Sequence, residues 1–230
     1  MDLPIFYLDT FSSSVITLNE ETSRHVVQVL RMEKGKKLQL TDGAGNLLLA
    51  EIVDPHKKKC TVQVIEKVFI PKKERKVSIG ISLLKNNTRF EWFLEKATEL
   101  GVTEIIPLVC SRTEKQHFRF DKMNQIVISA MMQSKQVWLA KLHAPTRFED
   151  LFSNTSYSSL LIAHCMDKEK TPLEQHMHSP SVQILIGPEG DFTQSEILKA
   201  LENSFNQVSL GNTRLRTETA GIVAATLLCL

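Results

Sequence analysis

The sequence predicts a chain in two parts: a small β-rich domain over residues 1–72, followed by an α/β domain with a parallel sheet over residues 73–230. Short apolar runs that are typical of strands dominate the first part. In the second part, single apolar runs alternate with amphipathic helical patterns, which predicts a parallel sheet covered by helices. A basic segment at residues 70–76 separates the two patterns and is typical of a linker.

The first part has the pattern of a small β-barrel. The segment DGAGN at residues 42–46 joins two apolar runs and is typical of a hairpin turn. Val26, Val29 and Leu30 recur at helical spacing, which predicts a short helix between the strands. A domain of roughly 70 residues is marginal by itself and becomes viable when docked on a larger one. The expected strands are residues 5–7, 37–41, 47–53 and 60–68, and the expected helix is residues 21–30.

Two helices of the second part have recognisable signals at their ends. Thr88 and Glu91 have capping-box spacing, and Gly101 is a typical helix end. Thr193 and Glu196 repeat the capping-box spacing. Open parallel sheets bind ligands at the loops beyond the carboxyl ends of their strands, so those loops are the place to look for a site. The expected strands are residues 77–84, 102–109, 159–164, 182–186 and 208–210, and the further expected helices are residues 121–134 and 217–230.

Composition and missing motifs exclude several classes of protein. Apolar residues make up 42% and charged residues 23% of the chain, with a net charge of +2, as in an ordinary soluble globular protein. The four cysteines form no CxxC pair, so neither a disulfide framework nor a zinc knuckle is expected, and a reducing cytoplasm fits best. No GxxxxGK[ST] motif and no early GxGxxG motif occur, which argues against a P-loop nucleotidase and a Rossmann-type methyltransferase.

Neither end of the chain predicts a membrane segment. The N-terminus lacks a basic region followed by an apolar stretch, so no signal peptide is expected. The apolar tail at residues 220–230 is too short to span a bilayer, so we expect a helix packed on the chain's own sheet or on a partner. His176 and His178 lack a third ligand placed by the sequence. These signals predict a cytoplasmic protein with no membrane association and no metal.

Positive charge is concentrated between residues 57 and 76, where eight Lys and Arg face two Glu. Such a local excess attracts phosphates and releases their counterions. A solvated turn and linker surface explains the same residues equally well.

Two strand-to-helix loops of the second part carry the residues with the most chemistry. The first, LIGPEGDF at residues 185–192, contains glycines that allow a close backbone approach and a proline that holds the turn. The second, LGNTRLRTETA at residues 210–220, has Arg216 immediately before the final helix. A guanidinium binds a phosphate or a base carbonyl through paired donors. Taken singly, each loop is more often an ordinary turn or a structural ion pair than a ligand site.

Together these two loops resemble the C-terminal blocks of the SPOUT-class methyltransferases, and within that class the RsmE family, which methylates N3 of a uridine in small-subunit ribosomal RNA. The chain departs from the family pattern at Thr213-Arg214, Met132 and Gln136, and it lacks the family's arginine within residues 1–7. These departures weaken the argument for assigning the family's RNA contacts to this chain. They leave the cofactor loops intact. Further matches are His25 with Val29-Leu30-Arg31, Asp42-Gly43-x-Gly45, Lys96-x-x-Glu99-Leu100-Gly101 and Gln133-Ser134.

This resemblance implies the fold, the cofactor and the reaction. The expected fold is a SPOUT-type parallel sheet with a C-terminal trefoil knot, preceded by a PUA-like β-barrel that helps hold RNA. Knots are rare exceptions among proteins, and no sequence periodicity predicts one. The expected activity is S-adenosylmethionine-dependent methylation of N3 of a specific uridine in 16S ribosomal RNA. The expected enzyme is a homodimer that acts on the RNA or on the assembled small subunit.

The resemblance also implies roles for individual residues. Methylation at N3 of uracil requires loss of the N3 proton, and Arg216 is expected to stabilise the charge that spreads onto the carbonyl oxygens. Glu189 or Glu218 is expected to accept the proton or to orient Arg216. The expected cofactor contacts are Leu185, Ile186, Gly187, Pro188, Glu189, Gly190, Leu210, Gly211, Leu215, Arg216 and Thr219. The expected RNA contacts are Arg24, His25, Arg31, Lys57, Lys58 and Lys59.

Two other functions fit the same residues. A non-catalytic RNA-binding protein on this scaffold would need only the barrel and the basic segment, and binding of S-adenosylmethionine separates it from an enzyme. An RNA methyltransferase of the same fold could act on another base, and the identity of the modified nucleotide separates it from a uridine-specific enzyme.

Overall fold

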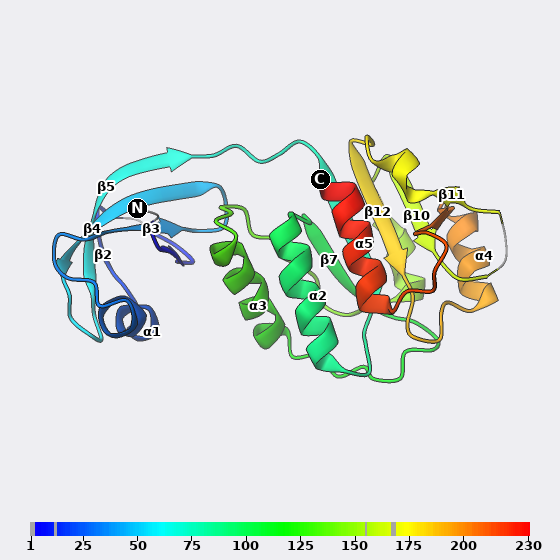
Figure 1. The fold of residues 1–230 in the computed structure, drawn as a ribbon, viewed down its shortest axis with the longest axis horizontal. Helices are drawn as coiled ribbons and strands as arrows, with labels where there is room; N and C mark the ends of the chain where they lie inside the picture. Colours follow the sequence, from blue (N-terminus) through cyan, green and yellow to red (C-terminus); the bar gives the residue numbers. More distant parts are fainter. Residues whose placement is uncertain (1–2, 12, 155, 167–168) are drawn as a thin grey trace. The chain divides into compact units, whose positions relative to one another are not determined.

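A computed structural model describes residues 3–11, 13–154, 156–166 and 169–230 of the chain. The chain divides into two compact units, shown in Figure 1 with colours that follow the sequence. The first unit comprises Met1–Lys72 with Met131–Leu139, and the second comprises Lys73–Ala130 with Ala140–Leu230. Within the described ranges, no helix is long and apolar enough to cross a membrane.

The first unit is built on a sheet of five strands, β1 (Ile5–Tyr7), β2 (Val15–Thr17), β3 (Lys37–Thr41), β4 (Asn46–Asp54) and β5 (Thr61–Phe69). Their order is β1-β3-β4-β5-β2, with β1 and β3 parallel and the other pairs antiparallel. The sheet curls into a half-barrel (Figure 1). This confirms the predicted small β-domain, with a curled sheet in place of a closed barrel. Alternate residues point inward and form the core, among them Leu38, Leu40, Leu48, Ala50, Ile52 and Val62.

The predicted hairpin turn at residues 42–46 is confirmed. Thr41 at the end of β3 pairs with Leu47 near the start of β4, so the turn lies between these two residues. The Asp42 carboxylate accepts hydrogen bonds from the Ala44 N–H at 2.8 Å and from the Asn46 side-chain amide at 2.6 Å. An Asp side chain that bonds its own turn in this way favours the turn over a continued strand.

The predicted helix at residues 21–30 consists of two different segments. α1 (Glu20–Arg24) is an α-helix capped by Asn19, whose side chain accepts the Thr22 N–H at 2.8 Å. The chain then continues as η1 (His25–Val29), a turn of π-helix. Its wider turn changes the direction of the side chains from His25 onward, so an ideal helical wheel misplaces Val29 and Leu30, which are 66% and 42% exposed.

The second unit contains the predicted parallel sheet, because every described strand pair in it is parallel. The strand order is β11-β13-β10-β12-β6-β7-β8, and β9 pairs with β7 beside β8. Its strands are β6 (Lys76–Ser82), β7 (Glu104–Val109), β8 (Lys141–Leu142), β9 (Thr146–Arg147), β10 (Ser159–Ala163), β11 (Thr171–Pro172), β12 (Ser181–Ile186) and β13 (Asn206–Ser209). The helices are α2 (Asn87–Leu100), α3 (Phe120–Gln133), η2 (Phe148–Asn154), η3 (Leu173–His176), α4 (Gln194–Glu202) and α5 (Thr217–Cys229).

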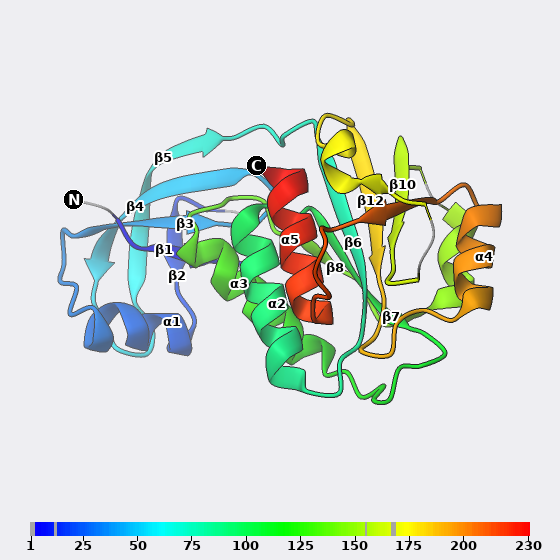
Figure 2. The same ribbon diagram turned by 45° about the vertical axis from the view of Figure 1, so that its right-hand side comes forward.

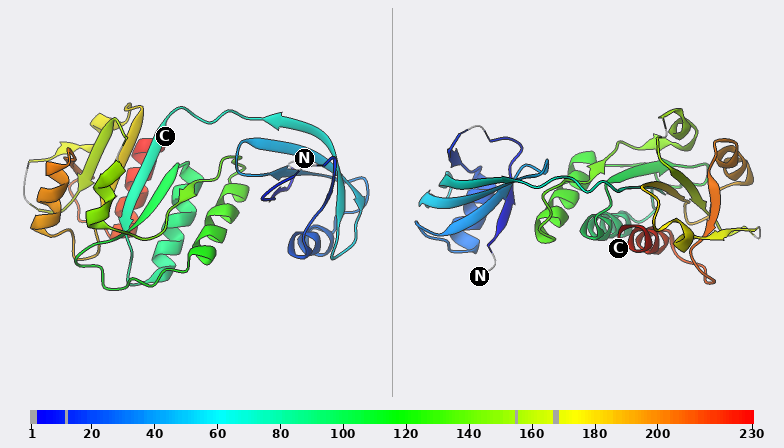
Figure 3. Two further views of the ribbon diagram at one scale, coloured as in Figure 1. Left: turned by 180° about the vertical axis from the view of Figure 1, so that it is seen from behind. Right: turned by 90° about the horizontal axis from the view of Figure 1, so that it is seen from above.

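Helices cover both faces of this sheet. The right panel of Figure 3 shows α2 and α5 on one side of the strands and α4 on the other. The core on the α4 side joins Leu108 and Leu185 of the sheet to Ile197 and Ala200 of α4. The second unit is therefore a three-layer α/β domain, in which the carboxyl ends of the central strands share one edge.

The helix ends follow their predicted signals with one exception. α4 begins with the capping box of Thr193 and Glu196, and α2 ends at Gly101 in the left-handed conformation, as predicted. The predicted capping box of Thr88 and Glu91 is wrong. α2 begins one residue earlier because the Asn86 side chain accepts the Thr88 N–H at 2.9 Å, and asparagine is a strong N-cap residue.

The C-terminal helix packs on the chain's own sheet. α5 contacts α2 and β6 (Figure 2), and its buried residues are small ones together with Glu218 and Leu228. The approach is close at Gly221, where an added Cβ would lie 2.6 Å from Phe93 Cε2 and 3.0 Å from Ile81 Cδ1. Glycine at this position lets the helix contact both neighbours directly.

Gly221→Ala is therefore expected to destabilise the second unit. Overpacking costs roughly 1–3 kcal/mol, and the gain in helix propensity returns about 1 kcal/mol. The net loss of about 1 kcal/mol corresponds to a melting temperature roughly 2–4 °C lower, measurable by circular dichroism. Thr226→Ala, on the exposed face of α5, is the matched control and should change the melting temperature little. An unchanged value for Gly221→Ala would contradict the close packing.

Candidate functional site

A cavity of about 720 Å³ lies at the carboxyl ends of β10, β12 and β13. Ala163 on the middle strand pairs with both Ile186 and Val208, and all three residues contribute to the cavity wall. The loops after the three strands complete the wall, so the two loops singled out in the sequence meet in one site. This is the edge at which an open parallel sheet binds ligands.

Most of the residues predicted to contact a cofactor line this cavity, and three do not. The Leu185 side chain is fully buried in the core that contains Phe192. Gly190 lies on the outer side of its loop, where its carbonyl accepts the Arg112 guanidinium, and Thr219 is not among the described lining residues. The predicted residues that line the cavity are Ile186, Gly187, Pro188, Glu189, Leu210, Gly211, Leu215 and Arg216.

A third part of the wall comes from the segment after β10, which the sequence did not single out. His164, Cys165 and Lys170 line the cavity there. The Lys170 ammonium donates to the carbonyl oxygens of His164 and Met166 at 2.9 and 2.8 Å, which joins Lys170 to the residues that directly follow β10. This segment contains no glycine or proline, and its only sequence signal was its position after a predicted strand.

Asp191 connects this segment to the glycine-bearing loop. Its carboxylate accepts the Cys165 N–H at 2.8 Å and the Phe192 N–H at 2.8 Å, through different oxygens. The Asp191 backbone has φ 64°, a left-handed conformation that Asp and Asn tolerate better than most residues. Asp191 thereby holds two walls of the cavity at a fixed distance.

Gly187 packs tightly against its own loop. An added Cβ would lie 3.0 Å from the Phe192 Cδ2 atom and 3.1 Å from the Phe192 nitrogen. The Phe192 ring is fully buried beneath the loop. Glycine at 187 therefore lets the loop lie flat on its own core, which differs from the predicted reason, the close approach of a ligand.

The structure separates the two glutamates that the sequence left as alternatives. The Glu189 side chain is exposed in the cavity wall, and its Oε1 atom accepts the Lys85 N–H at 3.2 Å. Glu218 is only 6% exposed and does not line the cavity. Its Oε1 atom lies 3.5 Å from the Nε atom of Arg89 on α2. Only Glu189 shares the cavity wall with Arg216.

Arg216 is the N-cap residue of α5 and extends an exposed side chain from the cavity wall. Its backbone is extended, with φ −69° and ψ 155°, so the residue belongs to the loop while the helix begins at Thr217. The position of its guanidinium therefore depends on how the first turn of α5 is held. Glu218 in that turn and its ion pair with Arg89 join the turn to α2.

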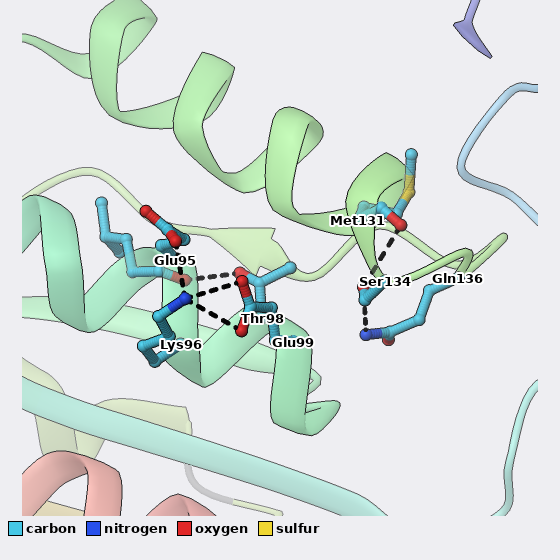
Figure 4. Close-up of polar contacts among 8 residues, drawn as sticks. Glu95, Lys96, Thr98, Glu99, Met131, Ser134 and Gln136 are labelled. Carbon is cyan, nitrogen blue, oxygen red and sulfur yellow. Dashed lines mark hydrogen bonds and ion pairs between the residues drawn. The ribbon is translucent and has the colours of Figure 1, made fainter. Parts of the chain in front are cut away.

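Two further motif matches, drawn in Figure 4, are not among the described residues that line the cavity. The Lys96 ammonium bonds Glu95 and Glu99 on its own helix at 2.7 and 3.0 Å. Gln133 is exposed at the end of α3. The Ser134 hydroxyl donates to the Met131 carbonyl at 3.3 Å and accepts the Gln136 amide at 2.9 Å. These residues make local bonds within α2 and after α3.

The residues predicted to contact RNA lie on the first unit. Glu20 joins two of them, because its carboxylate is 2.9 Å from Arg24 and 3.7 Å from Lys58. The His25 ring packs edge-on against Phe6, with 5.7 Å between ring centroids. Arg24 and His25 also line a shallow hollow of about 450 Å³. The remaining predicted contacts, Arg31, Lys57 and Lys59, are exposed.

The cysteines and histidines form no metal centre or disulfide within the described part of the chain. Burial raises the pKa of the Cys110 thiol to about 12 and that of Cys229 to about 11, which keeps both in the thiol form. His176 is bonded through Nδ1 to the Ser159 hydroxyl at 2.9 Å. Cys165 is the exposed cysteine, and it faces the cavity.

Comparison with known proteins gives one consistent result. Residues 71–229 match the family described as RNA methyltransferase domain, and residues 18–65 match the RNA methyltransferase PUA domain. The ribosomal RNA small subunit methyltransferase E of a Synechocystis strain is 29% identical over 92% of this chain and 71% of its own length.

Two solved structures resemble the whole chain. A probable rRNA-methyltransferase from Porphyromonas gingivalis is 36% identical with a TM-score of 0.90, over 97% of this chain and 95% of that one. A ribosomal RNA small subunit methyltransferase E from Neisseria gonorrhoeae, bound to S-adenosyl methionine, is 26% identical with a TM-score of 0.87 over the same shares. The resemblance carried by the two C-terminal loops is confirmed, and the chain belongs to the RNA methyltransferase family.

Proposed function

We propose that this protein transfers a methyl group from S-adenosylmethionine to N3 of a specific uridine in 16S ribosomal RNA. The observation that carries the proposal is the cavity in which both motif loops meet. Its location at the carboxyl edge of a parallel sheet is typical of a site that binds a nucleotide-like ligand. Membership of the RNA methyltransferase family and the names of the relatives support the substrate class.

The cavity fits this cofactor in size and in chemistry. A volume of about 720 Å³ lies within the roughly 300–1,000 Å³ usual for small-molecule sites. Apolar side chains of Ile186, Leu210 and Leu215 suit an adenine ring, and backbone groups of the loops suit its polar edge and the ribose. The cavity lining contains the carboxylates of Glu189 and Asp191 beside the cations Lys170, Arg214 and Arg216. Asp191 bonds backbone N–H groups, so the exposed Glu189 carboxylate is the group that can attract a sulfonium cation. When bound, S-adenosylmethionine supplies a methyl group activated by its positively charged sulfur.

Arg216 and Glu189 are the residues that we assign to the chemistry. The uracil N3 proton must leave before N3 can accept a methyl group, and negative charge then spreads to the flanking carbonyl oxygens. The Arg216 guanidinium stabilises that charge through its paired donors. Glu189, held by the Lys85 N–H, accepts the N3 proton.

Glu218 is a positioning residue in this scheme. It lies in the first turn of α5, directly after Arg216 and Thr217, and is almost completely buried. Separating the Glu218 carboxylate from Arg89 would leave a buried charge without its partner, which would destabilise the protein. The ion pair therefore holds the first turn of α5 in place against α2. The orientation of Arg216 follows from that fixed start.

The wider assembly also belongs to the proposal. We assign residues 1–72 to a PUA-like RNA-holding domain and residues 73–230 to a SPOUT domain whose C-terminal part forms a trefoil knot. The enzyme acts in the cytoplasm as a homodimer on ribosomal RNA or the assembled small subunit. Half-buried Ile222, Val223 and Leu227 on α5 offer apolar surface to a second copy.

The site of methylation tests the function directly. In a strain that lacks the protein, 16S ribosomal RNA should lose one N3-methyluridine, and purified protein with S-adenosylmethionine should restore it. Primer extension stops at an N3-methylated base, because the methyl group blocks pairing, and mass spectrometry of the nucleoside identifies it. A missing methyl group on another base would support a different specificity on the same fold.

Arg216→Ala is expected to lower kcat by about 10²–10³, the loss typical of removing one group that stabilises developing charge. The dissociation constant for S-adenosylmethionine, measured by calorimetric titration, should change less than tenfold, because the loop backbone holds the cofactor. Lys199→Ala, at an exposed position in the last turn of α4 and not among the described lining residues, serves as the control for loss of charge. Unchanged turnover in Arg216→Ala would remove Arg216 from the mechanism.

Glu189→Gln and Glu218→Gln are expected to differ in kind. The Glu189 variant should lose about 10²-fold or more in kcat and regain activity as pH rises, because hydroxide replaces the lost proton acceptor. The Glu218 variant should lower the melting temperature and keep the wild-type shape of the pH–rate profile. Equal pH profiles for Glu189→Gln and wild type would show that Glu189 is not the proton acceptor.

A further inference from the structure

The segment between β7 and α3 is basic, aromatic and exposed, and the chemistry assigned above does not use it. Residues 111–120 read SRTEKQHFRF, with three permanent cations against one carboxylate. Phe120 is 41% exposed. We call Arg112, Lys115, Phe118, Arg119 and Phe120 the β7–α3 strip. Cations alternating with aromatic rings are what a single-stranded nucleic acid requires of a binding surface.

The strip begins at the cofactor loop. The Arg112 Nη1 atom donates to the Gly190 carbonyl oxygen at 2.6 Å. Gly190 directly follows Glu189, which lines the cavity. Lys115 is three residues further along, so its Cα lies within about 11 Å of that of Arg112, the limit for an extended chain. The first residues of the strip therefore lie close to the loop that forms part of the cavity wall.

The segment that carries the strip is anchored to the protein at two points. The buried Thr113 hydroxyl lies 2.9 Å from the Ser82 hydroxyl and accepts the Cys110 N–H at 2.8 Å. Further along, the Phe118 ring packs edge-on against Phe90, with 6.0 Å between centroids. A surface ordered in advance loses less entropy when it binds.

The free positive charge of the strip lies on Lys115 and Arg119. The one carboxylate of the segment, Glu114, is 2.8 Å from the Lys85 ammonium and is neutralised by it. Nearby, Lys122 forms an ion pair with Glu91. Neither Lys115 nor Arg119 forms an ion pair with any residue that the structure describes. Both therefore remain available to phosphates.

We propose that the β7–α3 strip binds single-stranded nucleotides that flank the target uridine. Lys115 and Arg119 contact phosphates, and a base stacks on the exposed Phe120 ring. A single strand fits better than a duplex, because only unpaired bases present their faces to an aromatic side chain. This inference rests on the proposed function and adds a substrate subsite to the second unit.

The test compares Lys115→Gln/Arg119→Gln with the control Lys141→Gln/Lys199→Gln. The control removes the same charge from exposed positions on β8 and at the end of α4, away from the carboxyl edge of the sheet. The probe is 16S ribosomal RNA from a strain lacking the protein. The strip variant should bind it about tenfold more weakly, and its salt slope, d log K/d log [salt], should shrink by about 1.4, or 0.7 for each lost phosphate contact. Affinity for S-adenosylmethionine should stay at the wild-type value.

A second pair of variants tests the stacking. Phe120→Ala should weaken RNA binding roughly tenfold, the loss typical of one stacked base, while Phe120→Tyr keeps an aromatic face and should bind like wild type. Equal losses in both Phe120 variants would overturn the stacking.

The outcomes separate the strip from the proposed function. Wild-type affinity and salt slope in Lys115→Gln/Arg119→Gln, or an equal loss in the control variant, would overturn the strip as a binding surface. Failure of the wild-type protein to bind S-adenosylmethionine or to methylate any ribosomal RNA would overturn the proposed function instead.

Discussion

The parallel pairing of β10 with β12 and β13 is the constraint on which the rest of the second unit depends. Ala163 pairs with both Ile186 and Val208, so the three strands end at one level. The loops that follow them must leave the sheet side by side. A shift of register by one residue would turn every side chain of a strand to the opposite face and would separate these loops. The cavity is thus a product of sheet geometry before it is a product of its particular side chains.

The charged residues of the two loops differ in how deeply their side chains are buried. Glu189 and Arg216 lie in the cavity wall, where a ligand can reach them. Glu218 belongs to the same sequence block as Arg216, but it is buried and turned toward Arg89. Asp191 uses its carboxylate to hold backbone N–H groups of two loops. Each of the two sequence blocks therefore contains one charged residue that lies exposed in the cavity wall and one that bonds other parts of the protein.

Local signals in the sequence predicted the elements well, and interactions between distant residues account for what they missed. Thr193 and Glu196 predicted the start of α4, because a capping box involves only neighbouring residues. The capping box predicted at Thr88 is wrong, because Asn86, two residues earlier, caps α2 instead. The wall at His164, Cys165 and Lys170 has no motif, since it is shaped by Asp191 from another loop. The β7–α3 strip has no clear signal in the sequence, because Glu114 interrupts its positive charge. The fold places the Lys85 ammonium beside Glu114 and neutralises that carboxylate.

The described residues that line the cavity all come from the last third of the chain, between Ala163 and Ala220. During synthesis, a nascent chain with its first 160 residues exposed contains β6, β7 and the short strands β8 and β9 of the second sheet, and none of the described residues of this wall. Occupancy of the site can begin only once the C-terminal helix has left the ribosome and packed beside α2. Cofactor binding would then stabilise the finished fold by mass action while leaving earlier intermediates unaffected. The site therefore forms only after β12, β13 and the first turn of α5 have joined the strands made before them.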